Sequence, residues 1–168
     1  SALLLNAAMW GFVFEFGLNR RSQLLLLFGP NRLVTSHLGF WSFATLLCNL
    51  FLMIVFFSLL DRVASQLVPP PLPFALEGDG TRMLGFFVVV LIGPITEEVF
   101  FRGFVFPACL KRYGRHRAVV LSAIAFGIAH GDPSLFGPAF LAGCVFAYVY
   151  YRTGSLWPTI LAHTAQNA

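Results

Sequence analysis

The sequence predicts an all-α membrane protein, a polytopic bundle of about six transmembrane helices with a polar site inside the bundle. Of the 168 residues, 58% are hydrophobic and only 11% are charged. A soluble domain of this size carries roughly a quarter charged residues. Apolar segments of spanning length alternate with short connections that carry most of the basic residues. The net charge of +4 therefore reflects loops that set topology, and we expect no nucleic-acid partner.

Six apolar segments follow one another along the chain. Residues 38–60 form the clearest transmembrane helix, because only mild polar residues interrupt them. Residues 83–110 exceed the length that a bilayer needs, and Gly93-Pro94 predicts a kink within them. The segments before and after these two complete the bundle, although the fourth and the sixth are short. We expect the segments at about 2–18, 38–60, 83–110, 118–130, 135–151 and 155–167.

The connections predict the orientation of the chain in the membrane. Residues 61–82 form the longest polar connection, and Pro69-Pro-Pro-Leu-Pro73 within it cannot be helical. Residues 111–117 form the most basic loop, and basic and acidic connections alternate along the chain. This alternation places both termini outside the cytoplasm. After the fourth segment, Ser134 is the expected N-cap of the next helix, and no cleavable signal peptide is evident.

Two further patterns indicate helix packing. Three small residues occur at four-residue spacing, which lets membrane helices approach closely: Ala139, Gly143 and Ala147. The cysteines lie inside apolar segments without CxxC spacing, so we expect neither a disulfide framework nor a zinc cluster from Cys48, Cys109 and Cys144.

The strongest functional signal is Glu97-Glu98-x-x-x-Arg102 within a long apolar run. Ionisable groups at membrane depth cost several kcal/mol, so they are functional candidates by default. In a helix, Glu98 and Arg102 lie on one face, whereas Glu97 points about 100° away. We therefore interpret Glu98–Arg102 as a structural ion pair and Glu97 as the group that faces a working cavity. The alternative is a purely structural network of all three charges.

Three polar side chains on later segments are candidate partners of Glu97. Phe126 and His130 are four residues apart, and His163 and Asn167 have the same spacing on the last segment. Two polar residues on one face of an apolar helix form a matched pair of hydrogen-bonding groups, although they can also serve only as interhelical contacts. A lone histidine is more often structural, but the unpaired Glu97 favours a functional role for His130.

This set of residues suits the hydrolysis of a peptide bond by water. A carboxylate in apolar surroundings is a plausible general base, so Glu97 and His130 would activate the water. His163 and Asn167 would hold the developing oxyanion. The sequence has no serine or cysteine nucleophile motif and no HExxH. No cofactor is required, but Glu97, His130 and His163 are also a possible zinc ligand set.

The three ordered motifs resemble those of the CPBP family, the CAAX-protease and bacteriocin-processing (Abi) intramembrane proteases. This family includes the Ras-converting type II CAAX endopeptidase. The resemblance covers residues 84–168 and implies a catalytic helix core there, preceded by transmembrane helices and a Pro/Gly loop in residues 1–83. It also implies that Glu97 and His130 activate water and that His163 and Asn167 form the oxyanion hole. Glu98, Arg102 and Phe126 would then support the site.

The resemblance is to a compact bacterial member, which implies an integral protein of the bacterial inner membrane. It implies a membrane-associated peptide or protein as substrate, such as a bacteriocin precursor or a C-terminal sorting tail, in preference to a prenylated protein. Two alternatives stay open beside the glutamate mechanism. One is a zinc-dependent form of the same protease. The other is a non-catalytic immunity or peptide-binding membrane protein. A transporter or proton relay is a weaker option, and nothing in the sequence sets the oligomeric state.

Overall fold

The computed structural model describes residues 7–9, 11–12, 15, 32–65 and 79–168, and the side chains of all of these except 32–36 and 79–82. These residues contain helices and no strand, which confirms the predicted all-α membrane bundle. One long helix and one continuous helical rod form its two sides. The long helix is α3 (Arg32–Ala64), and the rod consists of α4 (Asp79–Phe87), η4 (Val88–Ile92), α5 (Gly93–Phe100), η5 (Phe101–Val105) and α6 (Phe106–Tyr113). The remaining helices are α7 (Arg115–Ala129), α8 (Pro133–Thr153) and α9 (Trp157–Asn167).

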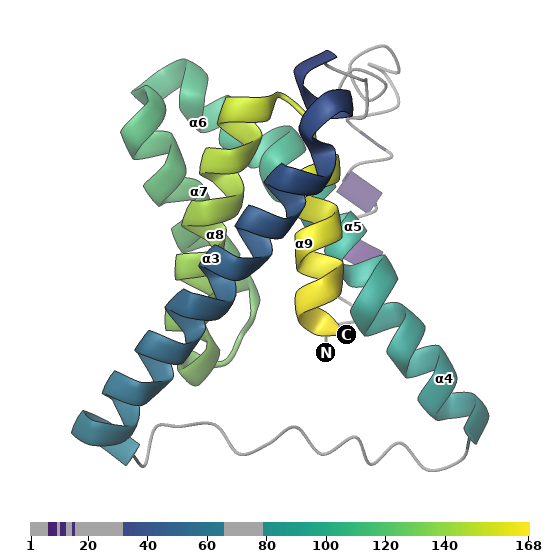
Figure 1. Ribbon diagram of the computed structural model, residues 1–168, viewed down its shortest axis with the longest axis vertical. Coiled ribbons are helices and arrows are strands. Elements are labelled where there is room, and N and C mark those ends of the chain that lie inside the picture. The colour runs from purple at the N-terminus through teal and green to yellow at the C-terminus, as the bar shows by residue number, and fades with distance from the viewer. Residues whose placement is uncertain (1–6, 10, 13–14, 16–31, 66–78) are drawn as a thin grey trace.

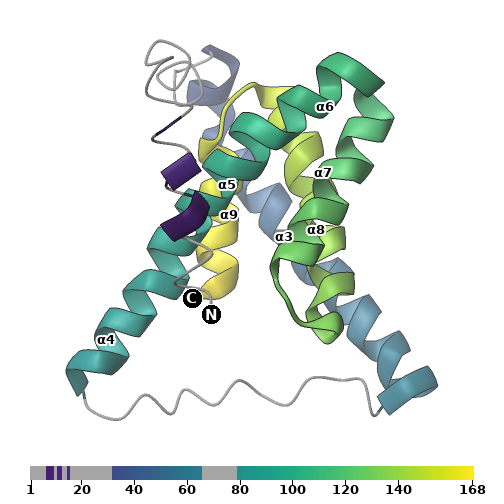
Figure 2. The same ribbon diagram turned by 180° about the vertical axis from the view of Figure 1, so that it is seen from behind.

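The two sides of the bundle diverge from one another toward one end of the molecule. In Figure 1, α3 descends to one side and the α4 end of the rod descends to the other. The helices α7 and α8 lie side by side and antiparallel, and α9 lies between α3 and α5 (Figures 1 and 2). Helix α9 therefore touches both sides of the bundle.

Three of the described helices are long and apolar enough to cross a membrane: His37–Ala64, Met83–Tyr113 and Pro133–Thr153. They correspond to the second, third and fifth predicted segments. The fourth and sixth segments form α7 and α9, which have only 15 and 11 residues. The first predicted segment, residues 2–18, lies mostly outside the described residues. Its helical part includes Met9, which packs with Phe101 and Phe126 in one apolar cluster.

The helices extend further into two predicted loops than the sequence suggests. Helix α3 continues to Ala64 and α4 begins at Asp79, so both ends of the predicted 61–82 connection are helical. The predicted basic loop of residues 111–117 is reduced to Gly114, whose φ of 76° suits a glycine between two helices. Arginine and lysine are good helix formers, so their charge does not by itself break a helix. The predicted Ser134 cap is wrong, because Asp132 is the N-cap of α8 and accepts from the Ser134 amide.

Two prolines explain the two π-turns of the rod. A proline inside a helix has no N–H, and its ring clashes with the carbonyl four residues earlier. Before Pro94, the Gly93 amide donates to the Val88 carbonyl five residues back. Before Pro107, the Phe106 amide donates to the Phe101 carbonyl in the same way. Each turn is widened where a proline follows, so the rod stays helical through Gly93-Pro94 and beyond.

Small residues let α7 and α8 pack closely, as the sequence predicts. A Cβ atom added at Gly143 would lie 3.0 Å from the Ala123 Cα atom and 3.1 Å from its Cβ atom. Ala139 and Ala147 are buried in two neighbouring apolar clusters. This close contact brings the backbone of α8 within reach of side chains from the rod.

Candidate active site

The two adjacent glutamates of α5 occupy different environments. The Glu98 side chain is fully buried, whereas 20% of the Glu97 side chain is exposed. Glu98 Oε1 accepts a hydrogen bond of 3.0 Å from Arg102 Nη1, so the predicted ion pair is present. Because consecutive helical residues point about 100° apart, one carboxylate faces the packed interior and the other faces an open side.

Arg102 joins three elements of the bundle. Its Nη2 atom donates to the Gly143 carbonyl on α8 at 3.3 Å. Its guanidinium carbon lies 4.4 Å from the ring centroid of Phe126 and 5.1 Å from that of Phe146. The cation is therefore buried between two aromatic faces, where cation–π attraction is strongest. Sequence reasoning named Phe126 but missed Phe146 and the Gly143 carbonyl, since no spacing rule pairs them with Arg102.

His163 of α9 lies between the two glutamates. Its Nδ1 atom is 3.1 Å from Glu98 Oε1, and its Nε2 atom is 3.9 Å from Glu97 Oε2. The ring stacks on Phe146 with a centroid separation of 5.0 Å. A carboxylate accepts, so Nδ1 donates to Glu98, and Nε2 then donates only when the ring is an imidazolium. This geometry determines which nitrogen of His163 faces Glu97.

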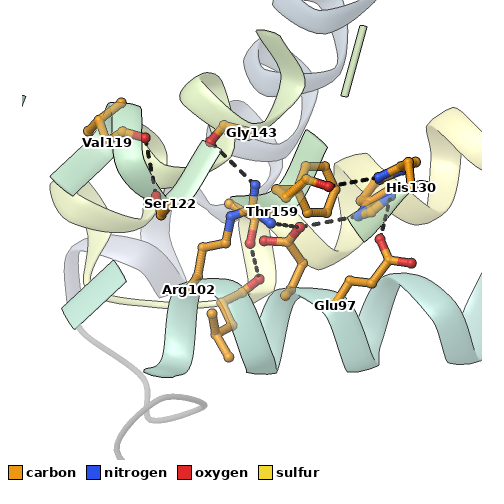
Figure 3. A network of polar contacts seen from close by, with 11 residues as sticks. Glu97, Arg102, Val119, Ser122, His130, Gly143 and Thr159 are labelled. Carbon is orange, nitrogen blue, oxygen red and sulfur yellow. Dashed lines mark hydrogen bonds and ion pairs between the residues drawn. The ribbon is translucent and has the colours of Figure 1, made fainter. Parts of the chain in front are cut away.

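His130 lies at the C-terminal end of α7, on the exposed side of the site. Its Nδ1 atom is 2.9 Å from the Phe126 carbonyl oxygen, which can only accept, so Nδ1 carries the hydrogen. In the neutral ring, Nε2 therefore has a free lone pair. Glu97 interacts electrostatically with both His130 and His163. Figure 3 shows the Glu97 carboxylate directed from α5 toward the side on which His130 lies.

Asn167 lies one turn beyond His163 on α9. Its Nδ2 atom donates to the Val89 carbonyl of η4 at 3.2 Å. The amide nitrogen carries two hydrogens, so one remains for another acceptor. The structure thus brings Glu97, Glu98, Arg102 and His163 together, whereas the contact described for Asn167 is with the rod two turns before Glu97.

The same residues bear on the possible zinc ligand set. Two histidines and a carboxylate match the donors of catalytic zinc sites, and a carboxylate on the second nitrogen of a histidine often orients a metal ligand. Within the described part of the chain, however, no group of three or more His, Cys, Asp or Glu side chains is placed to hold a metal ion. The donor types of Glu97, His130 and His163 fit zinc, but their positions in this structure do not form a zinc ligand set.

An open cavity of about 400 Å³ lies at the turn between α7 and α8. Its lining comes from the end of α7, the turn and the start of α8: Gly127, Ile128, Gly131, Asp132, Pro133 and Phe136. The turn that follows His130 therefore borders open space, while the carboxylates of α5 do not line this cavity.

Comparison with known proteins identifies the family. The family model "Type II CAAX prenyl endopeptidase Rce1-like" matches residues 79–168. The chain belongs to the Rce1-like CAAX protease family. This membership confirms the resemblance that the three motifs indicate, and the matched residues contain every side chain of the candidate site.

Two bacterial relatives of the Rce1-like family are similar over about half of this chain. YdiL of Bacillus subtilis (strain 168), which is named as a membrane peptidase, is 35% identical over 77 residues, or 46% of this chain and 32% of YdiL. The membrane-embedded CAAX protease MroQ of Staphylococcus aureus (strain USA300) is 31% identical over 87 residues, or 48% of this chain and 35% of MroQ. The matched part is thus about a third of the length of these relatives. No solved structure matches the chain.

Proposed function

We propose that this integral membrane protein is an intramembrane endopeptidase in which Glu97 and His130 activate a water molecule. The observation that carries this proposal is the division of the two glutamates. Glu98 is buried in an ion pair with Arg102, whereas Glu97 is partly open and lies 3.9 Å from His163. A carboxylate that lies near histidines and is not ion-paired with an arginine is available as a general base.

The reaction begins when Glu97 takes a proton from the water as its oxygen attacks the peptide carbonyl carbon. The free Nε2 lone pair of His130 accepts a hydrogen bond from the other water O–H, which stays intact, and so orients the molecule. The tetrahedral oxyanion is stabilised by the imidazolium Nε2–H of His163 and by the second amide hydrogen of Asn167. The C–N bond then breaks as Glu97 returns its proton to the leaving amine.

Glu98 and Arg102 do not touch the substrate in this mechanism. Glu98 accepts from His163 Nδ1 at 3.1 Å and so fixes the ring with Nε2 toward Glu97. Arg102 neutralises Glu98 and links it to α8 through the Gly143 carbonyl. These contacts support a preorganised donor, which lowers the reorganisation needed during the reaction.

The substrate is a membrane-associated peptide or protein, and the site lies in the bacterial cytoplasmic membrane. The lipid-compatible helices and the bacterial origin of both relatives support this assignment. A bacterial leader peptide, a bacteriocin precursor or a C-terminal sorting tail provides an extended segment near the bilayer. A zinc-dependent form of the same hydrolysis is the second candidate, because Glu98 orients His163 as carboxylates orient metal-bound histidines. It would require Glu97, His130 and His163 to move from their positions in this structure, which do not form a ligand set.

The test is proteolysis in liposomes with a panel of leader and C-terminal tail peptides. Wild-type protein is compared with Glu97→Gln and His163→Ala, each with and without a zinc chelator. Glu15→Gln is the matched control, because Glu15 is an exposed glutamate outside the site. We expect cleavage by wild type and the control, loss in both site variants and no effect of chelation. Chelator-sensitive cleavage that zinc restores would favour the metal form, and cleavage by Glu97→Gln would exclude the glutamate mechanism.

A further inference from the structure

The π-turn before Pro94 leaves the Val89 carbonyl without a partner in its own helix. In α-helical register the Val89 carbonyl would accept from the amide of residue 93, and in π register from that of residue 94. The Gly93 amide already donates to Val88, and Pro94 has no N–H. Neither amide is therefore available to Val89.

A side chain from the opposite end of the matched region occupies this position. Asn167 Nδ2 donates to the Val89 carbonyl oxygen at 3.2 Å, across 78 residues of sequence. Helix α9 packs along η4 and α5, and its C-terminal end lies beside the upper part of α4 in both views (Figures 1 and 2). An amide donor next to an orphaned carbonyl at membrane depth removes a cost that lipid cannot relieve.

The same contact constrains the position of His163. Asn167 and His163 are one turn apart on α9, and Val89 and Glu97 are two turns apart on the rod. A bond that fixes Asn167 against Val89 therefore limits both rotation of α9 and its sliding along the rod. His163 can then contact Glu98 at 3.1 Å and approach Glu97 to 3.9 Å at the same time.

We propose that Asn167 is a positioning residue whose amide fills the hydrogen-bonding gap that Pro94 opens at Val89, and that this contact sets the register of α9 against Glu97. The inference rests on the proposed function only for its activity readout. It also gives a reason for Pro94, which lies just before the glutamate pair. Pro94 leaves the Val89 carbonyl available as an acceptor, and Asn167 of α9 donates to it. One amide hydrogen of Asn167 then holds the helix, and the other is left for the substrate.

The proposal can be tested by exchanging the hydrogen-bond donor to the Val89 carbonyl. Pro94→Ala gives residue 94 an N–H that can reach Val89 in π register and replace the Asn167 donor. Asn167→Ala and the isosteric Asn167→Asp each remove that donor. Pro107→Ala is the matched control, because it makes the same change at the other π-turn, away from Val89. All variants are compared by their unfolding midpoint in detergent and by kcat and KM.

We expect either Asn167 variant to lower the unfolding midpoint by roughly 2–8 °C. Pro94→Ala in the same chain should recover at least half of that loss, and Pro107→Ala should recover none. Failure of Pro94→Ala to recover the midpoint, or equal recovery by Pro107→Ala, would overturn the proposal. Recovery of the midpoint without recovery of kcat supports both roles of Asn167. If no variant and no wild-type protein cleaves any peptide, the midpoints still decide the positioning role, and only the proposed protease activity fails.

Discussion

The inner and the open side of α5 differ although they begin at neighbouring residues. On the inner side, Glu98 is fully buried and bonded to Arg102 and His163. On the open side, Glu97 is 20% exposed, and its Oε2 atom lies 3.9 Å from His163 Nε2. The inner side is thus a buried network, in which Glu98 Oε2 and Arg102 Nε have no hydrogen-bond partner among the described residues, while the open side keeps a carboxylate available for a ligand. One helix thus carries a supporting residue, Glu98, and a candidate catalytic residue, Glu97, on different faces, because consecutive side chains point about 100° apart.

The inner side is also closed by apolar contacts. Phe126 and Phe146 lie against the Arg102 guanidinium, and both rings contact His163. A buried ion pair stabilises little by itself, because desolvation offsets its attraction. Removing only one partner of the pair is costly, however, since the other charge then stays buried without compensation. The two sides should therefore respond to mutation in different observables, namely stability on the inner side and activity on the open side.

The largest expected effect separates the two glutamates. Glu97→Gln should lower the rate of peptide cleavage by about 10²–10⁴-fold, the usual contribution of a general base, at an unchanged unfolding midpoint. Glu98→Gln should lower the unfolding midpoint, because it leaves the Arg102 cation without its anion. The measurement pairs cleavage kinetics with thermal unfolding in the same detergent. Equal folding defects in the two variants would contradict the division of roles.

Arg102→Ala tests the inner network directly. It leaves Glu98 buried without its partner, so we expect a loss of about 3–5 kcal/mol in the free energy of unfolding. Arg112→Ala is the control, because Arg112 is exposed on the rod and its guanidinium lies over the ring of Tyr113. The control should change stability by less than about 1 kcal/mol. Similar losses in both variants would show that buried Arg102 contributes no more to the free energy of unfolding than an exposed arginine does.

Gly143→Ala probes the backbone that accepts from Arg102. The added Cβ atom would lie 3.0 Å from the Ala123 Cα atom and 3.2 Å from the Phe126 Cδ1 atom, so α7 and α8 must separate slightly. We expect a loss of about 1–3 kcal/mol in the free energy of unfolding. Gly39→Ala is the control, since nothing lies within 4 Å of its added Cβ atom. An unchanged unfolding midpoint in Gly143→Ala would show that the contact of α7 with α8 has room for the added methyl group.

The smallest effect concerns the turn beside His130 on the open side. The Asp132 carboxylate accepts from the Ser134 hydroxyl and amide, and these hydrogen bonds lower the pKa of Asp132 below its ordinary value of 3.8. A lowered pKa contributes stability that is present above the ordinary value and lost as pH falls through the folded-state value. Asp132→Asn should therefore flatten the acidic part of the midpoint-versus-pH curve. Identical curves for wild type and variant would show that the charge of the Asp132 carboxylate does not stabilise the start of α8.

Local rules recovered much of the fold and part of the site. Hydropathy predicted the all-α bundle and the long helices, because membrane-spanning length is a local property. The i, i+4 spacing predicted the Glu98–Arg102 pair for the same reason. Helix ends were less predictable: Gly114 replaced a seven-residue loop, and Asp132 replaced Ser134 as the cap of α8. Caps and short turns depend on backbone geometry that composition does not specify.

The sequence by itself determined which residues share a helix face, and hence that Glu98 pairs with Arg102 while Glu97 does not. Only the tertiary structure decided what meets across helices. The Gly143 carbonyl became a partner of Arg102, His163 came to lie between two carboxylates, and Asn167 reached Val89. The physical reason is that helical periodicity is set by neighbours in sequence. Interhelical partners, in contrast, depend on the rotation and register of whole helices, which the packing of the entire bundle fixes.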